Sequence, residues 1–355
     1  MEILKKIIFL IIPLFLTGCY EDFTPEIDVK PVLCLNGLIT AGKPIEISVT
    51  HTKLYTDTDN FTQVEDVMLH IYANDRPVSG EYLAQEGDRI RIHAESPEYG
   101  SAEAEVTVPV SVPIEFLEFE ATATNIWRNT TVEMLADVTF NLKALMKIND
   151  PAKIANYYNI SYISFNPHED DGNLSDDFYD DDNLYGEDDS YNDEYEWNPP
   201  ITVRLSPGTF KYETEPIFSE HIGTFETVIT GSDTYGFSFF SDRQFSGKSY
   251  TLHLQFENMN YYVNHDTYNE EMFDCGLIFY LNTISASYYN WSNYRWQVQN
   301  GILGDLSDIG LADPMWGYSN VSTGAGVIAA QAFASYTLSL KDFLKNILPP
   351  DNTQL

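Results

Sequence analysis

The chain has 355 residues and a formal net charge of −35, from 54 acidic and 19 basic side chains, which excludes nucleic acid as a partner because its phosphates would be repelled. The same acidity opposes docking on an anionic membrane surface and favours solubility. The chain is 43% hydrophobic and 14% aromatic, enough for sizeable cores, and its length favours two domains over one.

The first eighteen residues have the pattern of an export signal, with lysines near the start and small residues before Cys19. Their apolar run covers only about ten residues, whereas a membrane-spanning helix needs about twenty. Leu16-Thr17-Gly18-Cys19 has the form of a bacterial lipobox, whose cysteine becomes the first residue and carries acyl chains such as palmitate. We predict a signal peptide over residues 1–18 and a stable lipid anchor at Cys19. The alternative is an ordinary signal peptide with a chance cysteine nearby.

A polar tether is predicted over residues 19–30, which would hold the folded body away from the bilayer. Glu21 and Asp22 directly follow the lipid site and resemble the acidic signal that sends lipoproteins of the Bacteroidetes to the outer face of the outer membrane. The alternative is a merely solvated linker.

Short strands separated by turn clusters are predicted from Pro31 to about Pro113. Residues 45–49 and 89–93 alternate with period two, the pattern of a strand with one buried face. The expected strands cover residues 32–38, 45–50, 67–72, 89–93 and 102–109. This spacing predicts an immunoglobulin-like β-sandwich over residues 31–112, and the stiff, proline-containing run 108–113 is the predicted domain boundary.

A larger β-rich domain is predicted over residues 113–345, followed by a tail over 346–355. The alternation of residues 251–256 predicts that Leu252, Leu254 and Phe256 face a core and that His253 does not. The expected strands cover residues 114–121, 132–142, 157–165, 235–241, 250–256 and 276–281.

One helix is predicted from about Ser285 to Gln299, with Thr283 or Ser285 as N-cap and Asn300-Gly301 as the stop. Its apolar stripe is expected to contain residues three and four apart, namely Tyr288, Trp291, Tyr294 or Arg295, and Val298. A strand is the alternative for this stretch, which is rich in tyrosine and tryptophan.

An acidic insertion is predicted over residues 168–198, because residues 169–196 hold fourteen Asp or Glu residues and no Lys or Arg. Clustered carboxylates are also potential ligands of calcium, but Tyr185 and Asn192 occupy places where a calcium loop needs dependable ligands. A solvated loop is the main interpretation, and the candidate cation ligands are Asp180, Asp181, Asp182, Asn183, Glu187, Asp188 and Asp189.

Motifs for catalysis are missing from the sequence, which contains no H-E-x-x-H, no G-x-S-x-G, no P-loop and no G-x-G-x-x-G. We therefore predict no enzyme, no catalytic residue, no cofactor and no confident metal site. Gly324-Ala325-Gly326 is interpreted as a close backbone approach at the start of a buried strand. Trp197, beside two prolines after the acidic insertion, is the candidate for stacking on a sugar or peptide, although most aromatic residues belong to cores.

Cys34 and Cys275 remain for pairing if Cys19 is acylated. Both lie in apolar segments, where a free thiol packs like a small hydrophobic side chain. Buried free thiols and a disulfide are both compatible with the sequence.

Three stretches together resemble the DUF4249 family of Bacteroidetes lipoproteins. The first contains Asn36-Gly37-Leu38-Ile39-Thr40, and the second is Asp150-Pro151 followed by Tyr157-Tyr158. The third runs from Asp313-Pro314 through Tyr318-Ser319-Asn320-Val321 to Gly324-Ala325-Gly326-Val327. The resemblance covers nearly the whole mature chain, and the acidic insertion departs from the family pattern.

The resemblance implies a surface partner of a TonB-dependent outer-membrane transporter, because such lipoproteins are commonly encoded beside these transporters. It carries no catalytic residues over to this chain. The leading hypothesis is a non-enzymatic binding or accessory protein for nutrient capture, lipid-anchored in the outer membrane and facing the exterior. An adhesin or surface-assembly component is the alternative, and a hydrolase comes third. The ligand cannot be deduced from the sequence.

Overall fold

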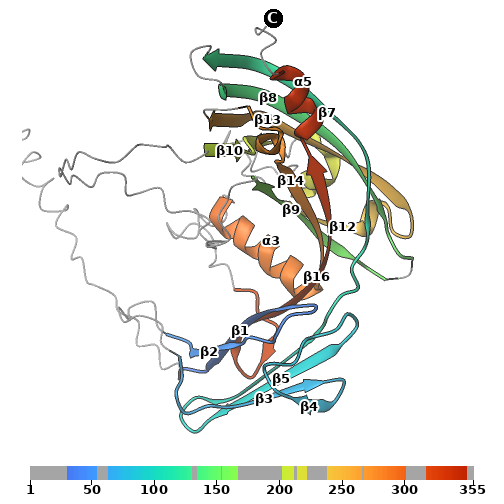
Figure 1. The fold of residues 1–355 in the computed structure, drawn as a ribbon. Coiled ribbons are helices and arrows are strands. Elements are labelled where there is room, and N and C mark those ends of the chain that lie inside the picture. Colours follow the sequence, from blue (N-terminus) through green and yellow to red (C-terminus); the bar gives the residue numbers. More distant parts are fainter. Residues whose placement is uncertain are drawn as a thin grey trace, which may run out of the picture. The chain divides into compact units, whose positions relative to one another are not determined.

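The computed structural model describes residues 30–53, 63–129, 134–152, 154–166, 202–211, 214–221, 238–265, 268–300 and 317–349. Within these ranges the chain is mainly β, with three sheets and two α-helices (Figure 1). All the sheets lie in the unit that begins at Val32. The predicted β-rich class is therefore confirmed.

The first sheet is organised around β16 (Ala325–Ser339), which pairs with different strands along its two halves. Residues 325–331 run parallel to β1 (Leu33–Thr40), and residues 331–339 run antiparallel to β14 (Gly276–Ile284). The full order is β12-β9-β14-β16-β1-β2, in which the remaining strands are β12 (Phe239–Ser241), β9 (Tyr157–Phe165) and β2 (Ser48–His51). β16, near the end of the chain, therefore connects β1, the first strand, with β14 in the same sheet.

The second sheet consists of long antiparallel strands whose alternation matches the sequence pattern. Leu252, Leu254 and Phe256 are buried and His253 is exposed, as predicted. Register shifts in the pairing of β7 with β8 and of β13 with β8 mark irregularities in these long strands. The order is β10-β13-β8-β7, with β10 (Thr202–Ser206), β13 (Ser249–His265), β8 (Met134–Asn149) and β7 (Ile114–Asn129), while β11 (Thr209–Phe210) also pairs with β13.

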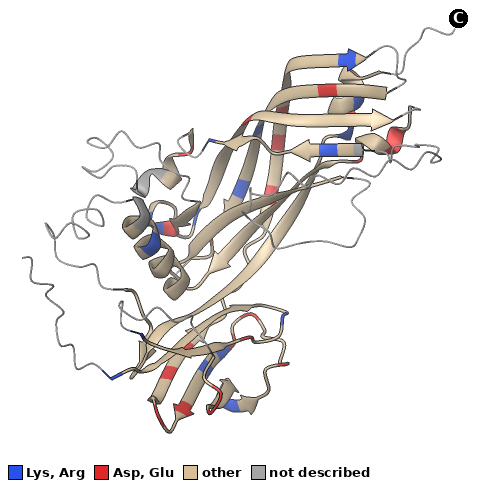
Figure 2. Ribbon diagram, turned by 90° about the vertical axis from the view of Figure 1, so that its left-hand side faces the viewer, with Lys and Arg blue, Asp and Glu red and all other residues tan. Residues whose placement is uncertain are grey.

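The third sheet comes mainly from the first third of the chain and has acidic and basic residues side by side (Figure 2). Arg91 lies 3.5 Å from Glu103 on the neighbouring strand, and its guanidinium lies 4.5 Å from the centroid of the Tyr72 ring. The order is β15-β6-β5-β3-β4, with β15 (Val321–Ser322), β6 (Gly100–Thr107), β5 (Arg89–Ser96), β3 (Met68–Ala73) and β4 (Arg76–Val78).

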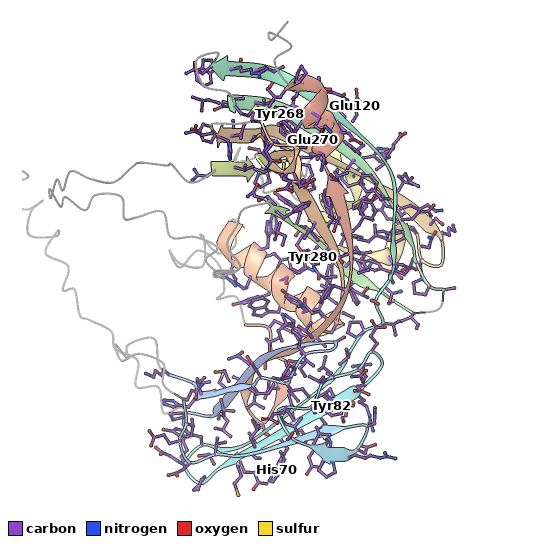
Figure 3. The ribbon with its side chains drawn as sticks, in the orientation of Figure 1. His70, Tyr82, Glu120, Tyr268, Glu270 and Tyr280 are labelled. Carbon is purple, nitrogen blue, oxygen red and sulfur yellow. The ribbon has the colours of Figure 1, made fainter. Side chains whose placement is uncertain are left out.

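Two apolar clusters fill the space between the sheets (Figure 3). One cluster joins the second sheet to β9, β14 and β16, and the stacked rings of Phe116 and Tyr336, whose centroids are 4.4 Å apart, pack against it. The other joins β1 to the third sheet and also includes Val321 and Ile328 from the far end of the chain. Residues near the carboxy-terminal end therefore complete a core that is otherwise built from the first third of the chain.

Each predicted strand has an observed counterpart within the described residues, and for residues 235–241 that counterpart is β12. The run 108–113 is an extended connection in which Val108 belongs to one cluster and Val112 to the other. The division into domains at this run stays a prediction.

The predicted helix is α3 (Ala286–Asn300), and Ser285 is its N-cap, because its Oγ accepts a hydrogen bond from the backbone N–H of Tyr288 at 3.3 Å. The second helix is α5 (Lys341–Ile347), and short 3₁₀ segments are η2 (Pro216–His221), η3 (Asp242–Gln244) and η4 (Glu270–Phe273). No helix among the described residues is long and apolar enough to cross a membrane.

The predicted apolar stripe of this helix is only partly buried. The side chains that α3 buries are small or turned toward the first sheet: Ser287, Tyr289 and Ser292 are buried, whereas Val298 is 39% exposed. Ser287 Oγ donates to the carbonyl oxygen of Ile328 at 2.9 Å, which brings the helix close to β16. The small side chain of Ser287 allows this close packing of the helix against β16.

Candidate functional site

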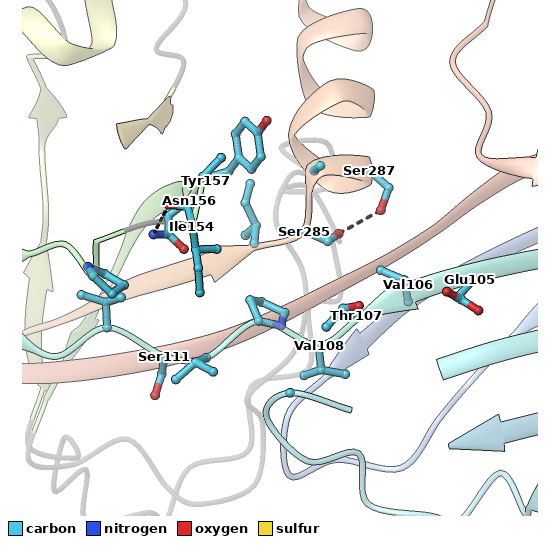
Figure 4. A pocket seen from close by; sticks show the side chains of 18 of the residues that line it. Glu105, Val106, Thr107, Val108, Ser111, Ile154, Asn156, Tyr157, Ser285 and Ser287 are labelled. Carbon is cyan, nitrogen blue, oxygen red and sulfur yellow. Dashed lines mark hydrogen bonds between the residues drawn. The ribbon is translucent and has the colours of Figure 1, made fainter. Parts of the chain in front are cut away.

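A cavity of about 860 Å³ lies where the end of β6 and the connection 108–113 pass the start of β9 and the start of α3 (Figure 4). Its volume is in the range of ligand-binding pockets. The lining residues come from distant parts of the sequence: Gly87, Glu105–Pro113, Asn149, Pro151, Ile154–Tyr157, Ile284–Ser287, Tyr318 and Asn320. We refer to this space as the junction cavity.

The lining of the junction cavity is largely apolar, and Glu105 is its one charged residue. Two hydroxyls face each other at the start of α3, where Ser285 Oγ and Ser287 Oγ are 2.9 Å apart (Figure 4). Ser285 Oγ also accepts from the backbone N–H of Ala330 at 3.0 Å, so this pair fixes the helix to β16. The cavity is suited to an uncharged, mainly apolar ligand.

The rim of the junction cavity exposes apolar side chains. Ile154 is 63% exposed and Val110 is 61% exposed, the highest fractions among the large hydrophobic side chains of the described residues. In the described chain, the backbone of residues 109–113 makes no hydrogen bond to other residues. The rim therefore offers apolar contacts and free peptide groups to a partner or ligand.

A buried carboxylate holds the segment just before β9. Asp150 is 7% exposed and accepts hydrogen bonds from Tyr158 Oη at 2.5 Å, Asn156 Nδ2 at 3.1 Å and the backbone N–H of Gly247 at 2.8 Å. Burial and the adjacent carboxylate of Asp150 raise the pKa of Tyr158, so its hydroxyl remains a donor. These donors compensate the buried charge and position one wall of the cavity.

The first and third of the stretches that carry the family resemblance meet in the fold, where β1 pairs with β16. Asn36 Oδ1 accepts from the backbone N–H of Val327 at 3.1 Å. Asn320 bonds both backbone groups of Ile328, accepting from its N–H at 2.9 Å and donating to its carbonyl oxygen at 2.8 Å. These asparagines therefore act as backbone mimics that fix strand pairing.

Glycines in the same region allow close approach of the two strands. A Cβ added to Gly324 would lie 2.5 Å from the carbonyl oxygen of Leu33. Gly326 has φ +106°, and its added Cβ would overlap the carbonyl oxygen of Leu35. The close backbone approach predicted for the Gly-Ala-Gly segment is confirmed.

The site residues named from the sequence lie outside the described residues: Cys19, Glu21, Asp22, Asp180, Asp181, Asp182, Asn183, Glu187, Asp188, Asp189 and Trp197. In the part of the chain that the structure describes, no three His, Cys, Asp or Glu side chains are grouped to hold a metal ion. Cys34 and Cys275 are free thiols, and burial raises the pKa of Cys275 to about 12, which keeps this thiol protonated.

The junction cavity itself was not predicted from the sequence. Its walls come from segments that are close only after β16 has joined the two apolar clusters. The proline-containing run 108–113 was the single available signal, because an extended segment without strand partners leaves backbone groups accessible.

The chain was compared with known proteins. A profile of the family described as "Domain of unknown function (DUF4249)" matches residues 20–337. No curated protein and no solved structure matches the chain. The matched range includes the junction cavity and both sides of the pairing between β1 and β16.

Proposed function

The chain belongs to the DUF4249 family, and from this membership we propose that it is a non-enzymatic binding or accessory partner of a TonB-dependent outer-membrane transporter in nutrient capture. The junction cavity carries the proposal, because its volume of about 860 Å³ and its largely uncharged lining suit a small ligand. The exposed rim next to it suits contact with a second protein.

The proposed location is the outer face of the outer membrane of a member of the Bacteroidetes. The lipobox ending at Cys19 supports a lipid anchor, and Glu21 and Asp22 support surface export. We propose that residues 31–112 form an immunoglobulin-like sandwich, followed in the chain by a larger β-rich domain. The observed pairing of β15 with β6 adds residues of the last part of the chain to the sheet that contains β6.

In the proposed mechanism the cavity binds the ligand and its rim contacts the transporter. An uncharged nutrient would exchange water for apolar contacts with the cavity walls. Val110 and Ile154 would contact the transporter, because both are apolar and mostly exposed at the rim. The strongly acidic remainder of the protein would oppose nonspecific association.

Capture of the transporter tests this proposal. Tagged lipoprotein at native expression, extracted in mild detergent, is expected to recover a TonB-dependent transporter, and Val110→Asp with Ile154→Asp is expected to reduce the recovery at least about tenfold, because charge is placed in an apolar contact. Met68→Asp is the matched control, since Met68 is 58% exposed on β3 and does not line the junction cavity. Recovery of no transporter with the unmodified protein contradicts the proposal.

Membrane attachment has its own test. Cys19→Ser is expected to move the processed protein from the outer-membrane fraction to the soluble fraction, because no acyl chain can be added to a serine hydroxyl at this site. Immunoblotting of separated membrane fractions measures the change. A processed Cys19→Ser protein that stays in the outer membrane contradicts lipid anchoring.

A further inference from the structure

A second, smaller cavity of about 360 Å³ lies between α3 and the paired strands β1 and β16, which are neighbours in Figure 1. Its wall on the helix consists of Tyr288 and Trp291. Its floor on the sheet contains Gly37, Val327 and Ala329, whose small or short side chains leave the aromatic rings uncovered. We refer to this space as the helix groove.

The aromatic residues of the helix groove are only partly used in the packing of α3. The ring of Tyr288 lies against those of Phe239 and Trp291, with centroids 5.5 and 6.1 Å away. Ser287 and Ser292 are buried, whereas Tyr288 and Trp291 are only partly buried. The exposed parts of these two aromatic rings are therefore available for a ligand.

A cation lies next to these rings. The guanidinium of Arg295 is 5.0 Å from the centroid of the Trp291 ring, and Arg295 is one turn further along the same side of the helix. Within the described residues Arg295 forms no ion pair, although the chain carries a net charge of −35. An unpaired guanidinium stacked on an indole retains donors for a carboxylate.

A polar group on the aromatic wall also lacks a partner. The hydroxyl of Tyr288 makes no hydrogen bond among the described residues, and desolvation by burial raises the pKa of Tyr288. The hydroxyl is not fully buried, so it can donate to a ligand oxygen. The groove thus combines ring surfaces with a neutral donor, and a cation lies beside it on the same helix.

We propose that the helix groove binds a carboxylate carried on a six-membered ring, with the ring against Tyr288 and Trp291 and the carboxylate at Arg295. The volume of about 360 Å³ suits a ligand of this size better than a chain of several rings. A uronic acid and an aromatic acid share this chemistry. The site is separate from the junction cavity and does not depend on a transporter.

Saturation-transfer NMR on the full-length lipoprotein in mild detergent tests the proposal with D-glucuronate and 4-hydroxybenzoate as probes. At least one acid is expected to bind saturably, and its neutral counterpart, D-glucose or 4-hydroxybenzyl alcohol, is expected to bind at least about tenfold more weakly because a charge-assisted bond is lost. The acid that binds identifies the ring as a sugar or an aromatic. Competition between the two acids would place both in one groove.

Variants assign the binding to the groove. Arg295→Gln is expected to weaken binding of the acid at least about tenfold and to leave the neutral analogue unaffected, while Trp291→Ala weakens both. Arg76→Gln and Trp127→Ala are matched controls, because both residues are exposed on other sheets. Circular dichroism confirms that each variant is folded.

Three results overturn the proposal: neither acid binds saturably, the neutral analogue binds as well as the acid, or folded Arg295→Gln binds like the original protein. Recovery of the transporter is expected to be unchanged in Arg295→Gln. Failure of the ligand experiment therefore leaves the transporter proposal intact, and failure of transporter capture leaves this one intact.

Discussion

Replacement of Gly326 by alanine is expected to disrupt the pairing of the first strand with the last and to lower the free energy of unfolding by about 3 kcal/mol or more. Gly326 has φ +106°, a conformation that side chains other than glycine rarely adopt, and the added methyl group would overlap the carbonyl oxygen of Leu35. The obstacle is backbone in the centre of a sheet, so only strand separation relieves it.

Gly42→Ala is the matched control for this substitution. Gly42 also has a positive φ, +78°, but nothing lies within 4 Å of its added Cβ. It therefore carries the conformational cost, about 1–2 kcal/mol, without the collision. Urea denaturation followed by tryptophan fluorescence measures both variants. Equal losses of stability in the two variants would contradict the close approach of β1 and β16 at Gly326.

Replacement of Asp150 by alanine is expected to be similarly severe, with a loss of about 3–5 kcal/mol. The substitution removes the acceptor of two buried donors, Tyr158 Oη and Asn156 Nδ2, and of the more exposed backbone N–H of Gly247. A buried donor that loses its partner costs about 1–3 kcal/mol, and the costs at neighbouring donors are not independent. Urea denaturation at neutral pH measures the loss.

Asp150→Asn separates the role of the oxygen atoms from the role of the charge. Asparagine retains one acceptor oxygen for Tyr158 but presents an amide NH₂ to the N–H of Gly247, so an intermediate loss of stability is expected. Glu118→Ala on the exposed edge of β7 is the control and is expected to change stability by less than about 0.5 kcal/mol. Full stability in Asp150→Ala would contradict the structural role of this carboxylate.

Local patterns predicted local structure well in this protein. The alternation of residues 251–256 correctly assigned the faces of β13, because a strand with one buried face repeats every two residues. Ser285 was among the two predicted N-caps, since a hydroxyl just before a helix accepts from its first turn. The Gly-Ala-Gly segment correctly indicated close backbone contact.

Tertiary contacts explain what the sequence could not predict. The predicted stripe containing Tyr288 and Trp291 is only partly buried, because Ser287 bonds to the backbone of β16 and brings the helix close to it. The pairing of Leu35 with Gly326 joins segments that no local pattern relates. Both cavities depend on this pairing, so neither was predicted. The residues predicted for lipid attachment and export lie outside the described residues.

The parallel pairing of β1 with β16 sets an order on how the protein can fold during synthesis. Synthesis delivers residues 33–107 long before residues 321–331, yet the early strands need the late ones to close their apolar interior. The first third of the chain must therefore stay incomplete until almost the entire polypeptide has been made. Premature termination before Val321 would leave this part of the chain open to proteolysis, which makes completion of the fold a checkpoint on full-length synthesis.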